Sequence, residues 1–90
     1  MSNIYNDALN ALGACNSSGL IFDLAKIMQE LCDQKLSTAE RNKHPVVILF
    51  LGQLSELAGL GTVDLDKWTD AYKECQRKAA EIELENKGGE

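Results

Sequence analysis

The 90-residue sequence contains one proline, one histidine and few aromatic residues, and it has no long hydrophobic run. Its most apolar stretch, residues 46–51, ends at Gly52 and is far shorter than the roughly 18 residues that a membrane-spanning helix needs. The opening residues carry no basic segment and are interrupted by Asn and Asp, which is not the pattern of a signal peptide. We therefore expect no membrane association and a cytoplasmic location.

Cysteine is also sparse, and the three cysteines are Cys15, Cys32 and Cys75. A secreted domain of this size that is stabilised by disulfides would have an even and denser set. Each of the three falls on an apolar helical stripe, where a free cysteine behaves as a small hydrophobic residue. The pattern predicts three buried thiols in a reducing compartment.

Positive charge is in the minority, because 14 acidic residues outweigh 9 basic ones and leave a net charge of −5. That balance repels phosphate backbones and disfavours nucleic-acid binding. Lys73, Arg77 and Lys78 share one side of a predicted helix, but carboxylates flank them. With 44% hydrophobic and 26% charged residues, the chain has the composition of one globular domain spanning residues 1–90.

Four segments carry apolar residues at helical spacing. They cover about residues 3–14, 19–35, 45–58 and 64–86. The sequence therefore predicts an all-α fold, a compact antiparallel bundle of four main helices with a proline corner before the third. Residues 87–90 are expected to form a frayed tail, because acidic residues accumulate at the negative end of the last helix dipole.

The proline corner is predicted from the segment before the third helix. Ser37 and Glu40 have the S-x-x-E spacing of a capping box, which indicates a short helix beginning at Thr38. Pro45 disfavours α geometry at His44, so that His44 becomes a candidate N-cap with Pro45 in the first turn of the next helix. A β-strand at residues 46–50 is the alternative, because Val, Ile and Phe favour strands.

The third helix also contains the candidate interaction site. On a helical wheel most of its apolar residues form one core-facing arc: Val46, Val47, Phe50, Leu51, Leu54, Leu57 and Ala58. Ile48 and Leu49 fall on the polar side, beside the small residue Gly52, and Phe22 falls on the polar side of the second helix. These four residues are predicted to bind a partner. The alternative is that the first helix or residues 37–44 cover Ile48 and Leu49.

No catalytic constellation is visible. His44 is the only imidazole, and its place before a proline indicates a helix cap. Cys15, Cys32, Cys75 and His44 could supply four zinc ligands, but structural zinc sites usually take their ligands as closely spaced pairs. We therefore expect no enzyme activity, no cofactor and no bound metal.

The leading functional hypothesis is a non-enzymatic protein–protein interaction module that self-associates or binds a protein partner. A small-ligand or metal-binding helical bundle is the alternative. The stretches "MSNIYNDALNAL" and "STAERNKHPVVILFLGQLSELAGL" resemble the short acidic single-domain proteins of enterobacterial phages and prophages. That resemblance implies a small accessory protein that binds a host or phage protein.

Overall fold

The computed structural model describes residues 3–14, 17–60 and 64–88, and the regular structure in these ranges is helical. The helices are α1 (Ile4–Ala14), α2 (Ser17–Asp33), α3 (Thr38–Asn42), α4 (Pro45–Leu57) and α5 (Leu65–Gly88). The all-α prediction is confirmed, and the strand alternative is wrong because residues 46–50 are helical. Among the described helices, none combines the length and the apolar character that a membrane crossing requires.

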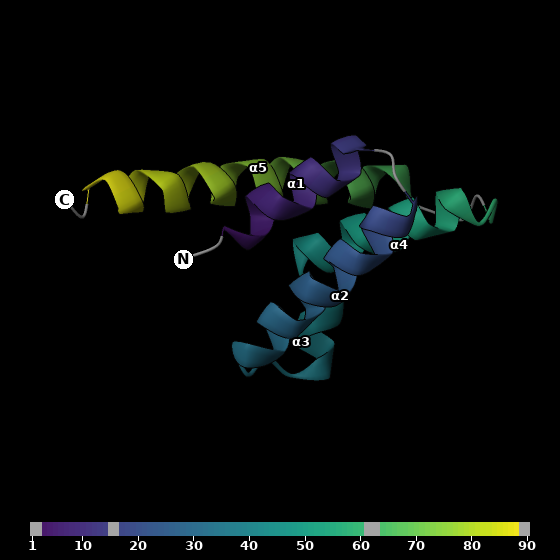
Figure 1. Cartoon of the computed structure of the whole chain (residues 1–90), viewed down its shortest axis with the longest axis horizontal. Helices are drawn as coiled ribbons and strands as arrows, with labels where there is room; N and C mark the ends of the chain where they lie inside the picture. Colours follow the sequence, from purple (N-terminus) through teal and green to yellow (C-terminus); the bar gives the residue numbers. More distant parts are fainter. Residues whose placement is uncertain (1–2, 15–16, 61–63, 89–90) are drawn as a thin grey trace.

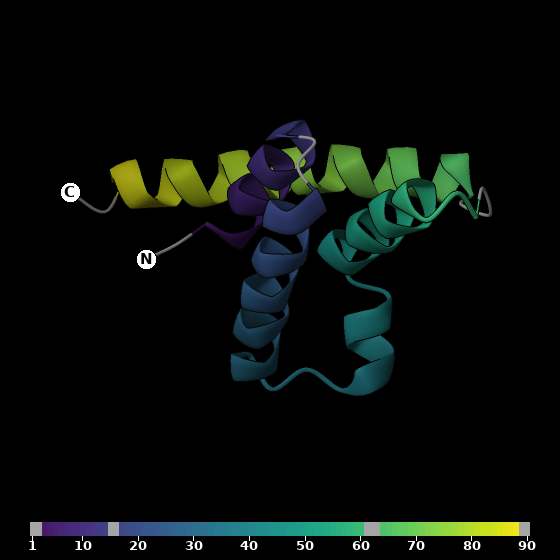
Figure 2. The ribbon, with the colours of Figure 1, turned by 45° about the vertical axis from the view of Figure 1, so that its right-hand side comes forward.

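The five helices form a body of 46 × 28 × 25 Å, whose long axis follows α5 (Figure 1). α1 crosses α5, and α2 runs away from α5 at a steep angle. After the short α3, helix α4 returns to the N-terminal half of α5 (Figure 2). The helices pack against one another as one compact all-α body, as predicted.

Local interactions define the predicted helix starts. The Ser37 hydroxyl accepts a hydrogen bond from the Glu40 N–H at 3.2 Å and donates one to the Glu40 carboxylate at 2.9 Å, which confirms the helical turn at α3. Asp64 caps α5, because its carboxylate accepts hydrogen bonds from the N–H groups of Asp66 and Lys67.

The proline corner also forms as predicted. His44 has an extended backbone (ψ 136°), and Pro45 occupies the first turn of α4. Since the proline ring disfavours α geometry in the preceding residue, α3 cannot run on into α4. The His44 side chain accepts a hydrogen bond from the Val46 N–H, so the predicted N-cap is confirmed.

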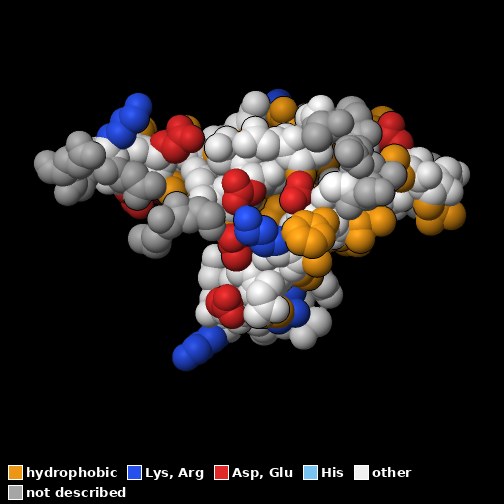
Figure 3. All heavy atoms as spheres, in the orientation of Figure 1, with side chains coloured by type: hydrophobic (Ala, Val, Ile, Leu, Met, Phe, Trp, Pro, Cys, Tyr) orange, Lys and Arg blue, Asp and Glu red, His pale blue; other side chains and the backbone are white. Residues whose placement is uncertain are grey.

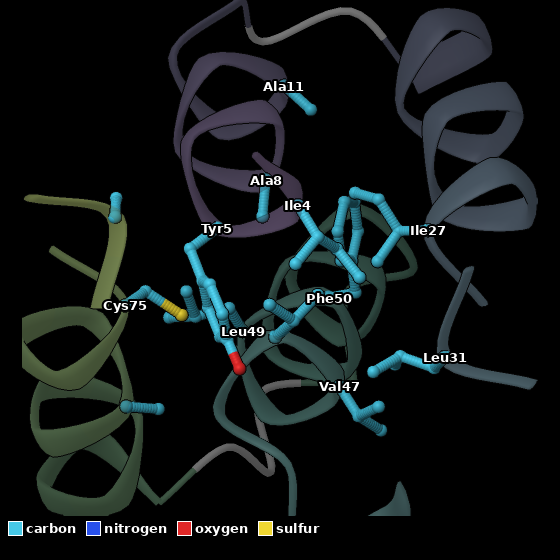
Figure 4. Packing of buried hydrophobic residues seen from close by; sticks show 13 residues of the cluster. Ile4, Tyr5, Ala8, Ala11, Ile27, Leu31, Val47, Leu49, Phe50 and Cys75 are labelled. Carbon is cyan, nitrogen blue, oxygen red and sulfur yellow. The ribbon is translucent and has the colours of Figure 1, made fainter. Parts of the chain in front are cut away.

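The core lies where α1 contacts α2, α4 and α5. Ala8 of α1 is fully buried and Ala11 nearly so, and such small side chains let neighbouring helices approach closely. Figure 4 shows Ile4, Ile27 and Phe50 meeting between α1, α2 and α4. On the side of α5, Tyr5, Leu49 and Cys75 continue the same cluster.

Helix α4 differs from the wheel-based prediction. Leu49 is fully buried, whereas Leu51 is 55% exposed and Leu57 is 47% exposed. The physical reason is that α4 contacts four other helices, so that its N-terminal half is covered on several sides rather than along one arc. The prediction of a single core-facing stripe is therefore wrong for α4, because such a stripe belongs to a helix that packs against one surface.

Helix α5 buries one face over the middle of its length. Cys75 and Ala79 are buried, but Leu65, at its N-terminal end, is 75% exposed. On the exposed side of the helix, Glu74 forms an ion pair with Arg77. The helix continues to Gly88, past the predicted end at residue 86, and residues 89–90 of the expected tail lie outside the described ranges.

The orientation of α4 predicts unequal effects of two identical substitutions. Leu49→Ala should lower the free energy of unfolding by about 2–5 kcal/mol, because it removes a fully buried side chain and leaves a cavity. Leu51→Ala, its matched control on the exposed side, should change that free energy by about 0.5 kcal/mol or less. Urea denaturation of both variants measures the difference, and equal losses would contradict this orientation.

Candidate functional site

The predicted partner-binding residues separate in the structure. Leu49 is fully buried and Gly52 is buried, so neither can contact a partner in this fold, and their assignment to the surface was wrong. Ile48 is half-buried beside a shallow hollow between α4 and α5 that Pro45 and Ala71 also line. Phe22 is 76% exposed on α2.

Other apolar side chains are exposed in the same half of the molecule as Phe22. They come from the start of α2, the middle and end of α4 with the turn that follows it, and the start of α5 (Figures 1 and 2). We define the exposed apolar surface as the six residues Ile21, Phe22, Leu51, Leu57, Leu60 and Leu65, whose exposed fractions range from 47% to 76%. Figure 3 shows hydrophobic side chains gathering over the N-terminal part of α2 and the C-terminal end of α4.

Most of this surface is not predicted by helical periodicity alone. Leu51 lies on the same side of α4 as Ser55 and Ala58, four and seven residues later, and that side faces away from the core. Leu57 lies seven residues after the buried Phe50, and therefore on the same side of α4, but it is the last residue of the helix and remains half exposed. A sequence signal did exist, because Leu51 is separated from Ile48 by one helical turn and both therefore share a face.

The best-defined polar cluster joins α1, α4 and α5 through His44. Its Nδ1 accepts the Val46 N–H at 3.4 Å, which places the proton of the neutral ring on Nε2. That Nε2 lies 2.9 Å from the Tyr5 hydroxyl, which can then accept its proton in a hydrogen bond. The Tyr5 and His44 rings are stacked at 5.3 Å, and the Lys78 ammonium lies 5.3 Å from the centre of the Tyr5 ring.

The electrostatics of this cluster favour neutral side chains. Burial lowers the pKa of His44, and the positive charge of Lys78 lowers that pKa further. Burial raises the pKa of Tyr5, with smaller contributions from Cys75 and Glu74. A neutral histidine and a neutral tyrosine that bond to each other fix the start of α4 against α1. The geometry therefore describes a link between α1 and the start of α4.

The cysteines occupy different environments. Cys75 is buried, and burial raises the pKa of its thiol to about 12, so that it stays protonated and unreactive at neutral pH. Cys32 is exposed near the end of α2, so the prediction that it is buried was wrong. Cys15 lies outside the described residues. Within the described part of the chain, no group of three or more His, Cys, Asp or Glu residues could hold a metal ion.

Two basic residues of α5 have intramolecular partners. Arg77 binds the carboxylates of Glu74 and Glu81, with N–O distances of 2.5 and 2.8 Å. Lys78 lies over the Tyr5 ring. Two of the three cations that the sequence places on one side of this helix are thus already engaged within the chain.

His44 predicts a pH-dependent stability. Because folding lowers the pKa of His44, the unfolded chain takes up the proton first when the pH falls through about 6.5, the usual value for histidine. The free energy of unfolding should therefore decrease between about pH 7 and the lowered pKa of the folded state. His44→Asn keeps an acceptor for the Val46 N–H but does not titrate there. Urea titrations should show a shallower pH slope for the variant, and identical slopes would contradict the assignment.

The thiols predict selective modification. In a Cys15→Ser background, a thiol reagent should modify Cys32 in the folded protein and reach Cys75 only when the chain unfolds. Cys32→Ser in the same background is the control and should abolish the fast reaction. Mass spectrometry of the modified protein measures the sites, and rapid labelling of Cys75 in the native state would contradict its burial.

Comparison with known proteins provides no relative from which a role could be transferred. No family model, no curated protein and no solved structure matches this chain.

Proposed function

We propose that this chain is a non-enzymatic accessory or regulatory protein that acts by binding another protein chain through the exposed apolar surface. The observation that carries the proposal is the exposure of six large apolar side chains in one half of the molecule. A soluble protein rarely leaves contiguous apolar patches larger than a few hundred Å² in water, and larger ones mark interaction sites.

Phe22 is the most exposed large apolar side chain of this surface. Aromatic residues are enriched at the centres of protein interfaces, and 76% of Phe22 is exposed to solvent. Full burial of a Phe or Leu side chain is worth about 1.5–3 kcal/mol. Several such side chains together can therefore offset the loss of translational and rotational freedom that association entails.

The polar groups support a binding role over a catalytic one. The His44 imidazole caps α4 and bonds to Tyr5, and the Cys75 thiol is buried and protonated. The resemblance of the sequence to short phage and prophage proteins agrees with an accessory role. A reducing, cytoplasmic setting fits the sparse cysteines and is part of the proposal.

The test uses variants of the exposed apolar surface and a matched control. Phe22→Ser with Leu51→Ser should abolish binding while leaving the circular-dichroism spectrum of the folded helices unchanged. Leu84→Ser is the control, because Leu84 is 70% exposed but lies 19 residues after Leu65, near the other end of α5. It should leave binding intact.

Binding is measured in two steps. Light scattering over a range of concentrations, with reductant, detects self-association of the purified chain. For a monomer, a photo-crosslinking residue at position 51 should give a discrete product in a cell extract, whereas the same residue at position 84 should not. Products of equal yield at both positions, or none at either together with a monomeric chain, would overturn the proposal.

A further inference from the structure

We propose that the exposed apolar surface receives an amphipathic helix that has an apolar face and basic flanks, rather than a second copy of this chain. This inference rests on the proposed function, since it specifies the chemistry of the partner at the same surface. It is carried by the charge of the residues that border the apolar side chains.

Carboxylates lie directly beside the exposed apolar residues along the chain. Asp23 follows Phe22, and Glu56 precedes Leu57. Leu65 lies between Asp64 and Asp66, both of which are exposed. Consecutive side chains of a helix diverge by about 100°, so Asp23, Glu56 and Asp66 lie to one side of the apolar residue that each adjoins, whereas Lys26, four residues after Phe22, shares its face.

A shallow hollow extends the acidic border from α2 onto α1. Asp7 and Asp23 line it together with Lys26 and Ile27. Figure 3 shows several acidic side chains, with a basic one among them, next to the apolar ones on this face. Four carboxylates (Asp23, Glu56, Asp64 and Asp66) therefore adjoin residues of the surface along the chain, and Asp7 lines the same hollow as Asp23, against two lysines, Lys26 and Lys67.

This charge pattern disfavours a symmetric pair of identical chains. A two-fold contact places the same surface of both copies together, so the acidic borders would face each other. Like charges that meet across an interface cost binding free energy, and the net charge of −5 on each copy adds to the repulsion. Arg77, which could have offset carboxylates of another copy, is held by Glu74 and Glu81.

A basic amphipathic helix would complement both the exposed apolar side chains and the carboxylates beside them. Its apolar face, with residues at helical spacing, would cover Phe22 and Leu51, and lysines or arginines on its flanks would lie opposite the bordering carboxylates. Charge complementarity of this kind acts mainly on specificity and on the rate of association, and it weakens in salt. Binding should therefore depend on the apolar residues and, separately, on ionic strength.

The experiment compares three fluorescently labelled peptides of equal length with the intact protein. One is an amphipathic Leu/Lys helix, the second replaces every Lys by Glu, and the third has the Leu/Lys composition in scrambled order. Fluorescence anisotropy should show the Leu/Lys helix binding at least about tenfold more tightly than either other peptide. Raising the salt from about 0.05 M to about 0.5 M should weaken this binding, because the screening length then shortens severalfold.

Protein variants separate the two contributions. Phe22→Ser with Leu51→Ser should abolish binding of the Leu/Lys helix. Asp23→Asn with Glu56→Gln should weaken it severalfold, whereas Glu83→Gln with Glu85→Gln, which remove the same charge near the far end of α5, should not. Equal weakening by both charge pairs would mean that net charge alone attracts the peptide and would overturn the inference.

The remaining outcomes distinguish this inference from the proposed function. If the Leu/Glu helix binds as tightly as the Leu/Lys helix, the basic partner is wrong while the apolar binding surface stands. If neither helix binds but the protein forms a dimer that Leu51→Ser dissociates, the occupant is a second copy and this inference is overturned. If neither binds and the protein stays monomeric, the inference fails, and the crosslinking experiment decides the proposed function independently.

Discussion

Five consecutive apolar residues, Val46 to Phe50, cover almost every direction around the first turns of α4, and most of them must be shielded from water at once. One neighbouring helix can cover only one side. The chain solves this by packing α1, α2, α3 and α5 around α4, which leaves Val46, Leu49 and Phe50 fully buried. The small residues of α1 contribute because Ala8 lets this helix approach its neighbours closely.

The His44 corner connects this burial to the local geometry of the chain. Pro45 forces the preceding residue out of α geometry, and the extended His44 then caps the helix that carries the apolar run. Its second ring nitrogen bonds to Tyr5 of α1, so one side chain serves both the helix start and the tertiary contact. Burial and the nearby Lys78 keep that imidazole neutral, which suits a group that must accept one hydrogen bond and donate another.

The same arrangement accounts for the exposed apolar surface. Neighbours surround the N-terminal half of α4, whereas Leu57 and Leu60, at and beyond its C-terminal end, stay largely in contact with water. Phe50 and Gly52, on either side of Leu51 in the chain, point toward neighbouring helices. Leu51 therefore points away from them and is exposed. A partner with an apolar face would cover the exposed apolar side chains, which the other helices of this small domain leave in water. The acidic border would favour basic flanks on that partner.

The sequence by itself determined the helices, the capping box of Ser37 and Glu40, the proline corner and the exposure of Phe22, because each depends on residues within one or two turns of one another. It did not determine the burial of Leu49 or the exposure of Leu51 and Cys32. Helical periodicity specifies which residues share a face, but not how many neighbours surround a helix or where along its axis they end. Only the tertiary structure decided those two quantities, and they moved the candidate site from Ile48, Leu49 and Gly52 to the exposed apolar surface.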